Sequence, residues 1–226
     1  MQMLHPSLIL STFHMNTLDE LETKSGQRDV GRTVNGMDRL SVEFDGMAEC
    51  DAGHVGHILN AGVEILTQGE DLLRALKPES YTRKVPAVFN ASIGGHYRHC
   101  LDHFTSLILA LDADEVDYDH RKRDPRIETQ PDFARALTAD IRCTLEQLMP
   151  DSLCTEVKAR CEVSYTHGNS PVTRSTLARE LVYCIAHAIH HFALISVMAR
   201  LMEVTLPEHF GVAPSTVAHL KKSAAP

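Results

Sequence analysis

The sequence predicts an all-α protein in which four amphipathic helices form a four-helix bundle. Apolar residues recur at three- and four-residue steps in four long segments, which is the pattern of helices buried on one side. Aromatic residues make up only 5% of the 226 residues and tryptophan is absent, although 43% of the chain is hydrophobic. The core must therefore consist mainly of aliphatic side chains and methionine, as is typical of packed helices.

The first 50 residues differ from the rest of the chain. Residues 12–49 are polar, contain several glycines and show no sustained period, so residues 1–50 are expected to be a poorly ordered leader. Met47 lies just before the first convincing helix, and one hypothesis is that residues 1–46 belong to an over-extended reading frame. Residues 51–226 then form the bundle and a C-terminal tail.

Turn residues and caps mark the ends of the four helices. Pro78 closes the first helix, Asn90 or Ser92 can cap the second, and Pro150 closes the third. The last helix begins near Ser175 or Thr176. The four helices are expected at about residues 54–76, 92–111, 131–149 and 176–203.

The segments between and after these helices have other patterns. Residues 112–130 are dense in charge and contain Pro125, so we expect a long crossover loop between the second and third helices. Residues 153–172 alternate in polarity and end in turn residues, which indicates a short hairpin or an irregular excursion before the last helix. Residues 208–226 are expected to form an extended tail.

Composition also limits the partners and the compartment. A formal net charge of −8 argues against a nucleic-acid-binding surface. No run of about 18 apolar residues and no signal-peptide pattern is present, so we expect neither a membrane span nor secretion. Six cysteines without a CxxC spacing indicate reduced thiols in a cytoplasmic protein.

Histidines on two of the predicted helices could form a metal site. His187 and His191 are four residues apart, so a helix presents both imidazoles on one side, whereas His190 falls on the far side. On the second helix His96, His99 and His103 share a face, and helical angles place His96 and His103 nearer the core than His99. Three imidazoles bind zinc, nickel, copper or ferrous iron and leave a coordination position open. The alternative is that these are boundary histidines with ordinary hydrogen bonds.

The same segments resemble the DinB/YfiT-like metalloenzyme superfamily. The likeness lies in S-I-G-G-H-Y-R-H-C-L-D at residues 92–102 and H-A-I-H-H at residues 187–191. It also takes in Y-D-H-R-K-R-D-P-R-I-E at residues 118–128 and F-G-V-A-P-S-T at residues 210–216. The resemblance covers roughly residues 53–220 and leaves the leader without a counterpart.

The resemblance implies an up-down-down-up four-helix bundle that is often dimeric. It also implies a divalent metal held by one histidine of the second helix and an H-x-x-x-H pair of the last, which here are His99, His187 and His191. His99 is selected by the motif because it follows an Ile-Gly pair and precedes a leucine and an aspartate. This choice disagrees with the helical angles, which favour His96 or His103.

Other residues of these segments are candidates for supporting roles. Asp102 would orient an imidazole or would be an ordinary surface acid, and His103 would support the ligands or contact substrate. Cys100 and Cys184 lie beside the ligands but fall on apolar stripes, which favours buried, inert thiols. The charged residues of the crossover either cover the site and bind an anionic group or fasten the loop as an ion-pair network; they are Arg121, Arg123, Arg126 and Glu128. His54 and His57 are expected to face solvent.

These observations predict a cytoplasmic, metal-dependent enzyme. The metal is expected to be zinc or nickel, with iron or manganese as alternatives. The resemblance implies a thiol-dependent transferase, an isomerase or a hydrolase that acts on a small molecule such as a low-molecular-weight thiol, in a homodimer. Two other functions remain open: a non-catalytic metal- or ligand-binding bundle of the stress response, and a purely structural helical dimer.

Overall fold

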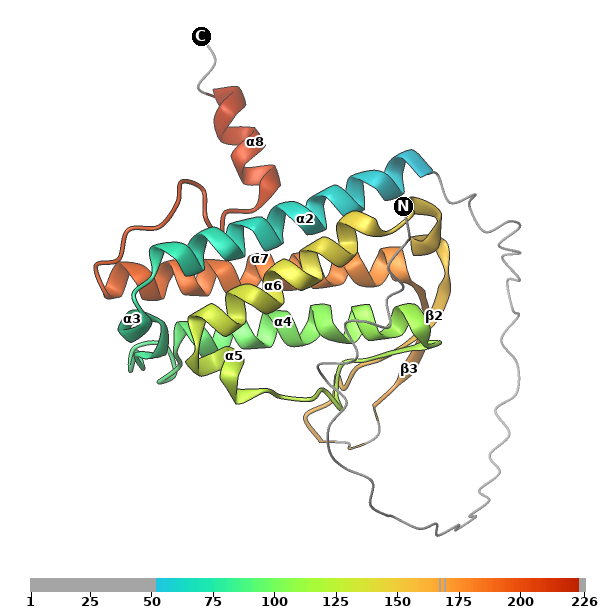
Figure 1. Cartoon of the computed structure of the whole chain (residues 1–226), viewed down its shortest axis with the longest axis horizontal. Coiled ribbons are helices and arrows are strands. Elements are labelled where there is room, and N and C mark those ends of the chain that lie inside the picture. The colour runs from blue at the N-terminus through green and yellow to red at the C-terminus, as the bar shows by residue number, and fades with distance from the viewer. Residues whose placement is uncertain (1–51, 167, 169, 224–226) are drawn as a thin grey trace, which may run out of the picture. The chain divides into compact units, whose positions relative to one another are not determined.

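The computed structural model describes residues 52–166, 168 and 170–223. Four long helices dominate this part of the chain and lie side by side (Figure 1). In Figure 1 the colours show that two of them run opposite to the other two. The first pair is α2 (Ala52–Ala75) and α7 (Leu177–Leu201), and the second is α4 (Ile93–Leu109) and α6 (Pro131–Gln147).

The core lies between these helices. Helix α2 packs against α6 and α7, and α4 packs against α7 and α6. The largest side chains that are fully buried are aliphatic or aromatic and come from all four helices; they include Leu72, Tyr97, Leu101, Phe104, Leu145, Leu181, Ile195 and Met198. The expectation of an aliphatic core is confirmed.

A three-stranded sheet corrects the expected all-α class. Strand β1 (Glu115–Asp117) pairs in parallel with β2 (Glu156–Arg160), which pairs antiparallel with β3 (Val172–Thr176). The antiparallel pair confirms the hairpin that residues 153–172 predict. The sequence missed β1 because a three-residue strand has no period of its own, and its partner lies about 40 residues downstream.

Short helices fill segments that were expected to be irregular. The predicted crossover loop contains helix α5 (Pro125–Thr129), and a 3₁₀ turn, η1 (Ala110–Asp112), takes the place of the predicted end of the second helix. The predicted extended tail contains α8 (Pro214–Ser223), which has no buried residue. The remaining short elements are α3 (Pro78–Thr82) and the 3₁₀ helix η2 (Pro150–Cys154).

Side-chain caps fix where the two histidine-bearing helices begin. The Ser92 hydroxyl accepts a hydrogen bond from the Gly95 backbone N–H at 3.1 Å, so Ser92 is the N-cap of α4. Thr176 does the same for α7 by accepting from the Arg179 N–H at 3.2 Å. Asn90 is not the cap; its backbone has a positive φ of 54° in the preceding turn.

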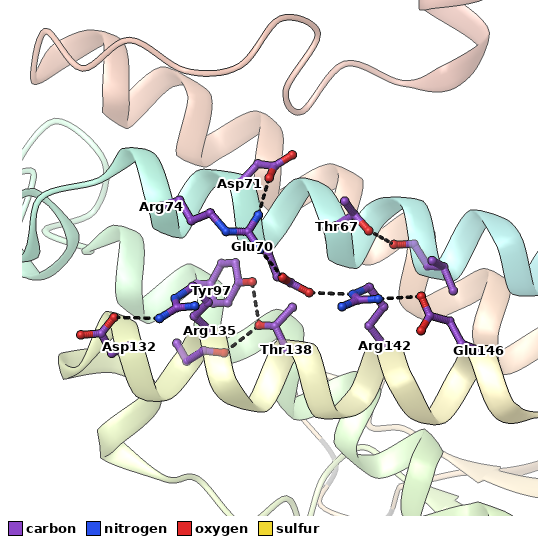
Figure 2. A network of polar contacts seen from close by, with 12 residues as sticks. Thr67, Glu70, Asp71, Arg74, Tyr97, Asp132, Arg135, Thr138, Arg142 and Glu146 are labelled. Atoms are coloured by element: carbon purple, nitrogen blue, oxygen red, sulfur yellow. Dashed lines mark hydrogen bonds and ion pairs between the residues drawn. The ribbon is translucent and has the colours of Figure 1, made fainter.

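Polar side chains tie α6 to its neighbours (Figure 2). Glu70 of α2 is buried and accepts hydrogen bonds from Arg142 of α6 at 2.7 Å and from Arg74 at 2.6 Å. The buried hydroxyls of Tyr97 and Thr138 are 2.9 Å apart and join α4 to α6. Because a buried carboxylate is stabilised only when its hydrogen bonds are made, this network fixes the position of α6 against α2.

Helix α7 differs from the other described helices in being long and apolar enough, by length and composition, to cross a membrane. It also carries the buried carboxylate of Glu180, and its side chains Leu181, Phe192 and Ile195 are buried against the neighbouring helices. Only 33% of its apolar stretch is buried, however, and Val182, Val197 and Leu201 of the same helix are exposed, so its place in the core accounts for part of its apolar character.

One cysteine departs from the expected reduced state. Cys154, at the end of η2, is disulfide-bonded, whereas Cys100, Cys143, Cys161 and Cys184 are free. The prediction of six reduced thiols is therefore wrong for Cys154. A disulfide depends on the approach of two residues in space, which the spacing of cysteines in a sequence does not show.

Close packing at Gly94 yields a stability prediction. A Cβ at Gly94 would lie 2.1 Å from the Glu128 carbonyl oxygen and 2.8 Å from the Tyr81 ring, so Gly94→Ala should destabilise the fold by about 2 kcal/mol or more. Gly56 of α2 has no atom within 4 Å of such a Cβ, so Gly56→Ala should stabilise by about 0.5–1 kcal/mol. Urea denaturation of both variants measures the difference. Equal stability of the two variants would contradict this account of Gly94.

Candidate metal centre

The seam between α4 and α7 gathers histidines from both helices. Helix α4 contributes His96, His99 and His103, which are three and four residues apart, and α7 contributes His187 and His191. These spacings place successive imidazoles one turn apart on the side that faces the other helix. His103 and His191 are buried, and the other three are half-buried.

The ring positions bring the three predicted ligands together. The ring centroids of His99 and His187 are 4.8 Å apart, those of His99 and His191 4.7 Å, and those of His187 and His191 4.6 Å. A second set overlaps with this one, because His99, His103 and His187 offer nitrogens that lie within 4.8 Å of one another and could hold a metal ion. The two sets share His99 and His187 and differ in the third ligand.

Hydrogen bonds indicate which ring nitrogens carry protons. His103 Nδ1 lies 2.8 Å from the His99 carbonyl oxygen, and a carbonyl can only accept, so we assign the proton of His103 to Nδ1. His96 Nδ1 and His191 Nδ1 are 2.9 Å apart, so one of them donates to the other. If His191 is the donor, its Nε2 keeps a lone pair for a metal, and the hydrogen bond to His96 orients the His191 ring.

Burial keeps the imidazoles neutral. Desolvation lowers the pKa of His99 to about 2, of His191 to about 3, and of His103 and His187 to about 4, and neighbouring histidines add to each shift. Desolvation also lowers the pKa of His96. At neutral pH each ring therefore has one lone pair, which is the form that binds metals.

Two buried ring nitrogens have no partner among the described residues. They are His187 Nε2 and His96 Nε2. A buried polar atom without a hydrogen bond is costly, and such atoms are uncommon in folded proteins. At His187 the unpartnered nitrogen belongs to both possible ligand sets, so the residues present fit a metal ion that is held by three imidazoles.

Arg121 of the crossover reaches the histidines. Its Nη1 lies 3.2 Å from His99 Nδ1 and 3.1 Å from His103 Nδ1. The sequence left open whether the charged crossover residues cover the site or fasten the loop by ion pairs. Arg121 covers the site. Its positive charge contributes to the lowered pKa of His99, His103 and His187.

The other predicted charged residues form an ion-pair network beside the site. Arg98 bonds to Asp102 at 3.0 Å and to Glu128 at 3.2 Å, and Lys84 also bonds to Glu128. Burial raises the pKa of Asp102 although Arg98 opposes the shift. Asp102 thus forms an ion pair with Arg98 and has no hydrogen bond to an imidazole in the described structure.

Neither Arg123 nor Arg126 forms a hydrogen bond or ion pair with a histidine in the described structure. Arg123 is exposed, and Arg126 pairs with Asp124 and lies over the Phe133 ring. His54, His57 and His190 are exposed as expected. Cys100 and Cys184 are buried, and burial raises the pKa of each thiol, that of Cys184 to about 12, which confirms inert thiols.

A cavity beyond the histidines was not predicted from the sequence. It has a volume of about 540 Å³ and lies between β2, β3 and the start of α7, with Tyr118, Cys161, Glu180 and Tyr183 in its lining. The Tyr118 ring stacks on His103 with centroids 5.2 Å apart, and Tyr183 lies 5.7 Å from His187, so the two tyrosines separate the cavity from the histidines.

Glu180 is the buried carboxylate of this cavity. It accepts hydrogen bonds from the Tyr118 hydroxyl at 2.8 Å and from the Ser175 hydroxyl at 2.5 Å. One signal in the sequence pointed to it, because Glu180 interrupts the apolar stripe of the last helix between Leu177 and Leu181. Tyr118 begins the segment 118–128 that carries part of the family resemblance, but no role was predicted for it.

Comparison with known proteins gives the family. The model of the DinB family matches residues 53–212, which is more than half of the chain. FK506-binding protein 5 of Rhizopus delemar is 34% identical over 107 residues. That match covers 47% of this chain and only 28% of the relative's length. No solved structure matches. Since the family model spans the four long helices and the histidine-bearing seam, the chain belongs to the DinB family.

Proposed function

We propose that this protein is a divalent-metal-dependent enzyme of the DinB type. The observation that carries the proposal is the cluster of neutral, half-buried and buried imidazoles at the α4–α7 seam, with one ligand nitrogen unpartnered. We further propose that the four long helices are the up-down-down-up bundle of the family.

His99, His187 and His191 are the proposed ligands. His191 is preferred to His103 because the H-x-x-x-H pair of α7 places two ligands on successive turns, and because His96 can orient His191 through their Nδ1 contact. His103 donates to the His99 carbonyl, and its ring packs edge-on against the ring of His99 with centroids 4.7 Å apart, so it would support the His99 ligand.

Zinc or nickel fits a site of imidazole ligands best, with iron or manganese as alternatives. A metal held by three imidazoles would supply Lewis acidity at an open position and would lower the pKa of a water or thiol bound there. The protein residues hold the ligands neutral and restrict water at the seam. We propose thiol transfer to or from a small molecule as the reaction, with isomerisation or hydrolysis as the alternatives and a low-molecular-weight thiol as the partner.

The assembly and location are also proposals. Val182, Val197 and Leu201 of α7 are exposed and apolar, which supports a homodimer in which they are covered. The net charge of −8 supports the absence of nucleic-acid contacts. We propose a cytoplasmic protein without a membrane partner.

The ligand set can be tested by metal analysis of protein purified without a histidine tag. We expect about one divalent ion per chain, most of which is lost in His187→Gln and His191→Gln, because each removes a ligand. His103→Gln should retain the ion, and exposed His190→Gln is the control. Loss of metal from His103→Gln but not from His191→Gln would show that His103 is the third ligand. Absence of metal from the unsubstituted protein, even after refilling with zinc or nickel, would refute the site.

The metal-free protein should lose stability as the pH falls. The folded-state pKa values of His99, His103, His187 and His191 lie below the unfolded value of about 6.5, so the unfolded chain binds more protons at mildly acidic pH. The free energy of unfolding should therefore decrease as the pH drops from 7.5 to 5. Urea denaturation in the presence of a chelator measures this, and His187→Gln should reduce the pH dependence because it removes one of the shifted imidazoles. A stability that is constant or higher at pH 5 would contradict it.

Catalysis can be separated from metal binding with a panel of low-molecular-weight thiols and electrophiles. The metal-loaded protein should turn over at least one pair, and His99→Ala should reduce that turnover by on the order of 10²-fold or more, because the open position is lost with the metal. His190→Ala should keep the activity. If the protein binds metal in full yet no reaction depends on His99, the non-catalytic metal-binding bundle is the better function.

A further inference from the structure

Arg121 and a metal ion need the same lone pair of His99. A guanidinium carries only donors and stays protonated in proteins, so at 3.2 Å it donates to His99 Nδ1 and the imidazole accepts. A neutral imidazole has one lone pair, so when Nδ1 accepts, the proton lies on Nε2. The Nδ1 lone pair is then used by Arg121, and Nε2 carries the proton. His99 therefore cannot bind a metal through either nitrogen while it accepts a hydrogen bond from Arg121.

Charge adds to this exclusion. The guanidinium also lies 3.1 Å from His103 Nδ1 and 3.5 Å from its Nε2, so it occupies the space between two imidazoles of the cluster. A divalent cation held by the same rings would be a few ångströms from a positive charge, in surroundings where such repulsion is weakly screened. Metal binding at His99 therefore requires Arg121 to move.

A possible acceptor for a displaced arginine lies two residues earlier in the chain. Among the described residues, the buried Nε of Arg121 has no hydrogen-bond partner, and neither has the buried Oδ2 of Asp119. The other oxygen of Asp119, Oδ1, accepts from the Glu162 backbone N–H at 3.0 Å and holds the carboxylate in place. A donor and an acceptor thus lie unsatisfied in one loop, and an ion pair between them would satisfy both.

We propose that Arg121 is an internal competitor of the metal. In the metal-free protein it donates to His99 and stabilises the neutral cluster; when a metal binds, Arg121 leaves the ring and pairs with Asp119. Arg121 thereby lowers the metal affinity of the site, and metal occupancy sets the conformation of the crossover. This inference rests on the proposed metal site because it requires His99 to be a ligand.

The test is the zinc affinity of the full chain, measured by competition with a chromophoric chelator. Removal of the competitor in Arg121→Ala should tighten zinc binding by on the order of tenfold. Arg121→Gln, which retains more of the side chain, should tighten it as well if the alanine variant folds poorly. The matched control is Arg123→Ala, which removes the same charge from the same loop at an exposed residue without a hydrogen bond or ion pair in the described structure. That variant should bind zinc within about twofold of the unsubstituted protein, an expectation that follows from solvent screening.

Asp119 provides a second, independent measurement. Asp119→Asn keeps the Oδ1 that accepts from Glu162 but removes the charge that would receive Arg121. Zinc binding should weaken severalfold in Asp119→Asn and should be unaffected by the same substitution when Arg121 is already alanine. The double-mutant cycle should therefore give a coupling energy well above experimental error.

The outcomes separate the two proposals. If the unsubstituted protein binds zinc and Arg121→Ala binds no more tightly than Arg123→Ala, the metal site stands and the competition is refuted. Additive effects of the Arg121 and Asp119 substitutions would refute the exchange between His99 and Asp119. If neither the unsubstituted protein nor any variant binds zinc, the metal site itself fails, and the competition with it.

Discussion

A single lone pair on each neutral imidazole is the constraint on which the histidine seam depends. Burial disfavours the charged rings, so every histidine of the cluster must pair one N–H with an acceptor and one lone pair with a donor or a metal. His103 meets the first demand through the His99 carbonyl, and His191 can meet it through His96. His99 meets the second through Arg121, while His187 Nε2 is left without a partner. A metal would satisfy His187 and would take the lone pair of His99 from Arg121.

The fold builds this seam from backbone features at the start of α4. Ser92 caps the helix, and Gly94 lets the Glu128 carbonyl approach closely, which fixes the rotation of α4 against α5 and hence the direction of His96, His99 and His103. The buried Tyr81 hydroxyl donates to the Ile127 carbonyl at 2.6 Å and so ties α3 to α5 beside the start of α4. On the other side of the seam, Thr176 is both the last residue of the hairpin strand β3 and the N-cap of α7. The histidines are thus positioned by regular secondary structure, which gives a more precise site than a loop would.

Much of this arrangement could be predicted from the sequence, because apolar periodicity specifies long helices directly. The four helices and the hairpin follow from it, and so does the i,i+4 pair of His187 and His191. The third ligand could not be chosen in this way: His96, His99 and His103 span two helical turns on one face, and their angles differ by less than the uncertainty in the position of the partner helix. Strand β1 and the contact of Arg121 with the histidines could not be predicted from the sequence for another reason. Both depend on a parallel pairing with residues about 40 positions away. The disulfide at Cys154 and the helix in the tail likewise have no periodic signal.

Strand β1, which the sequence did not predict, connects the cavity to the histidines. Strand β1 leads directly into Tyr118 and, three residues later, Arg121, so one segment places a phenol on the Glu180 carboxylate and a guanidinium on the imidazoles. This segment is fastened to the sheet by the Tyr118 N–H to the Arg160 carbonyl, and to its own first residues by Asp117, which accepts from the backbone of Asp119 and His120. A shift of β1 by one residue along β2 would turn its side chains to the opposite face and would remove Arg121 from the histidines. The register between Val116 and Ala159 therefore determines whether Arg121 reaches the histidines.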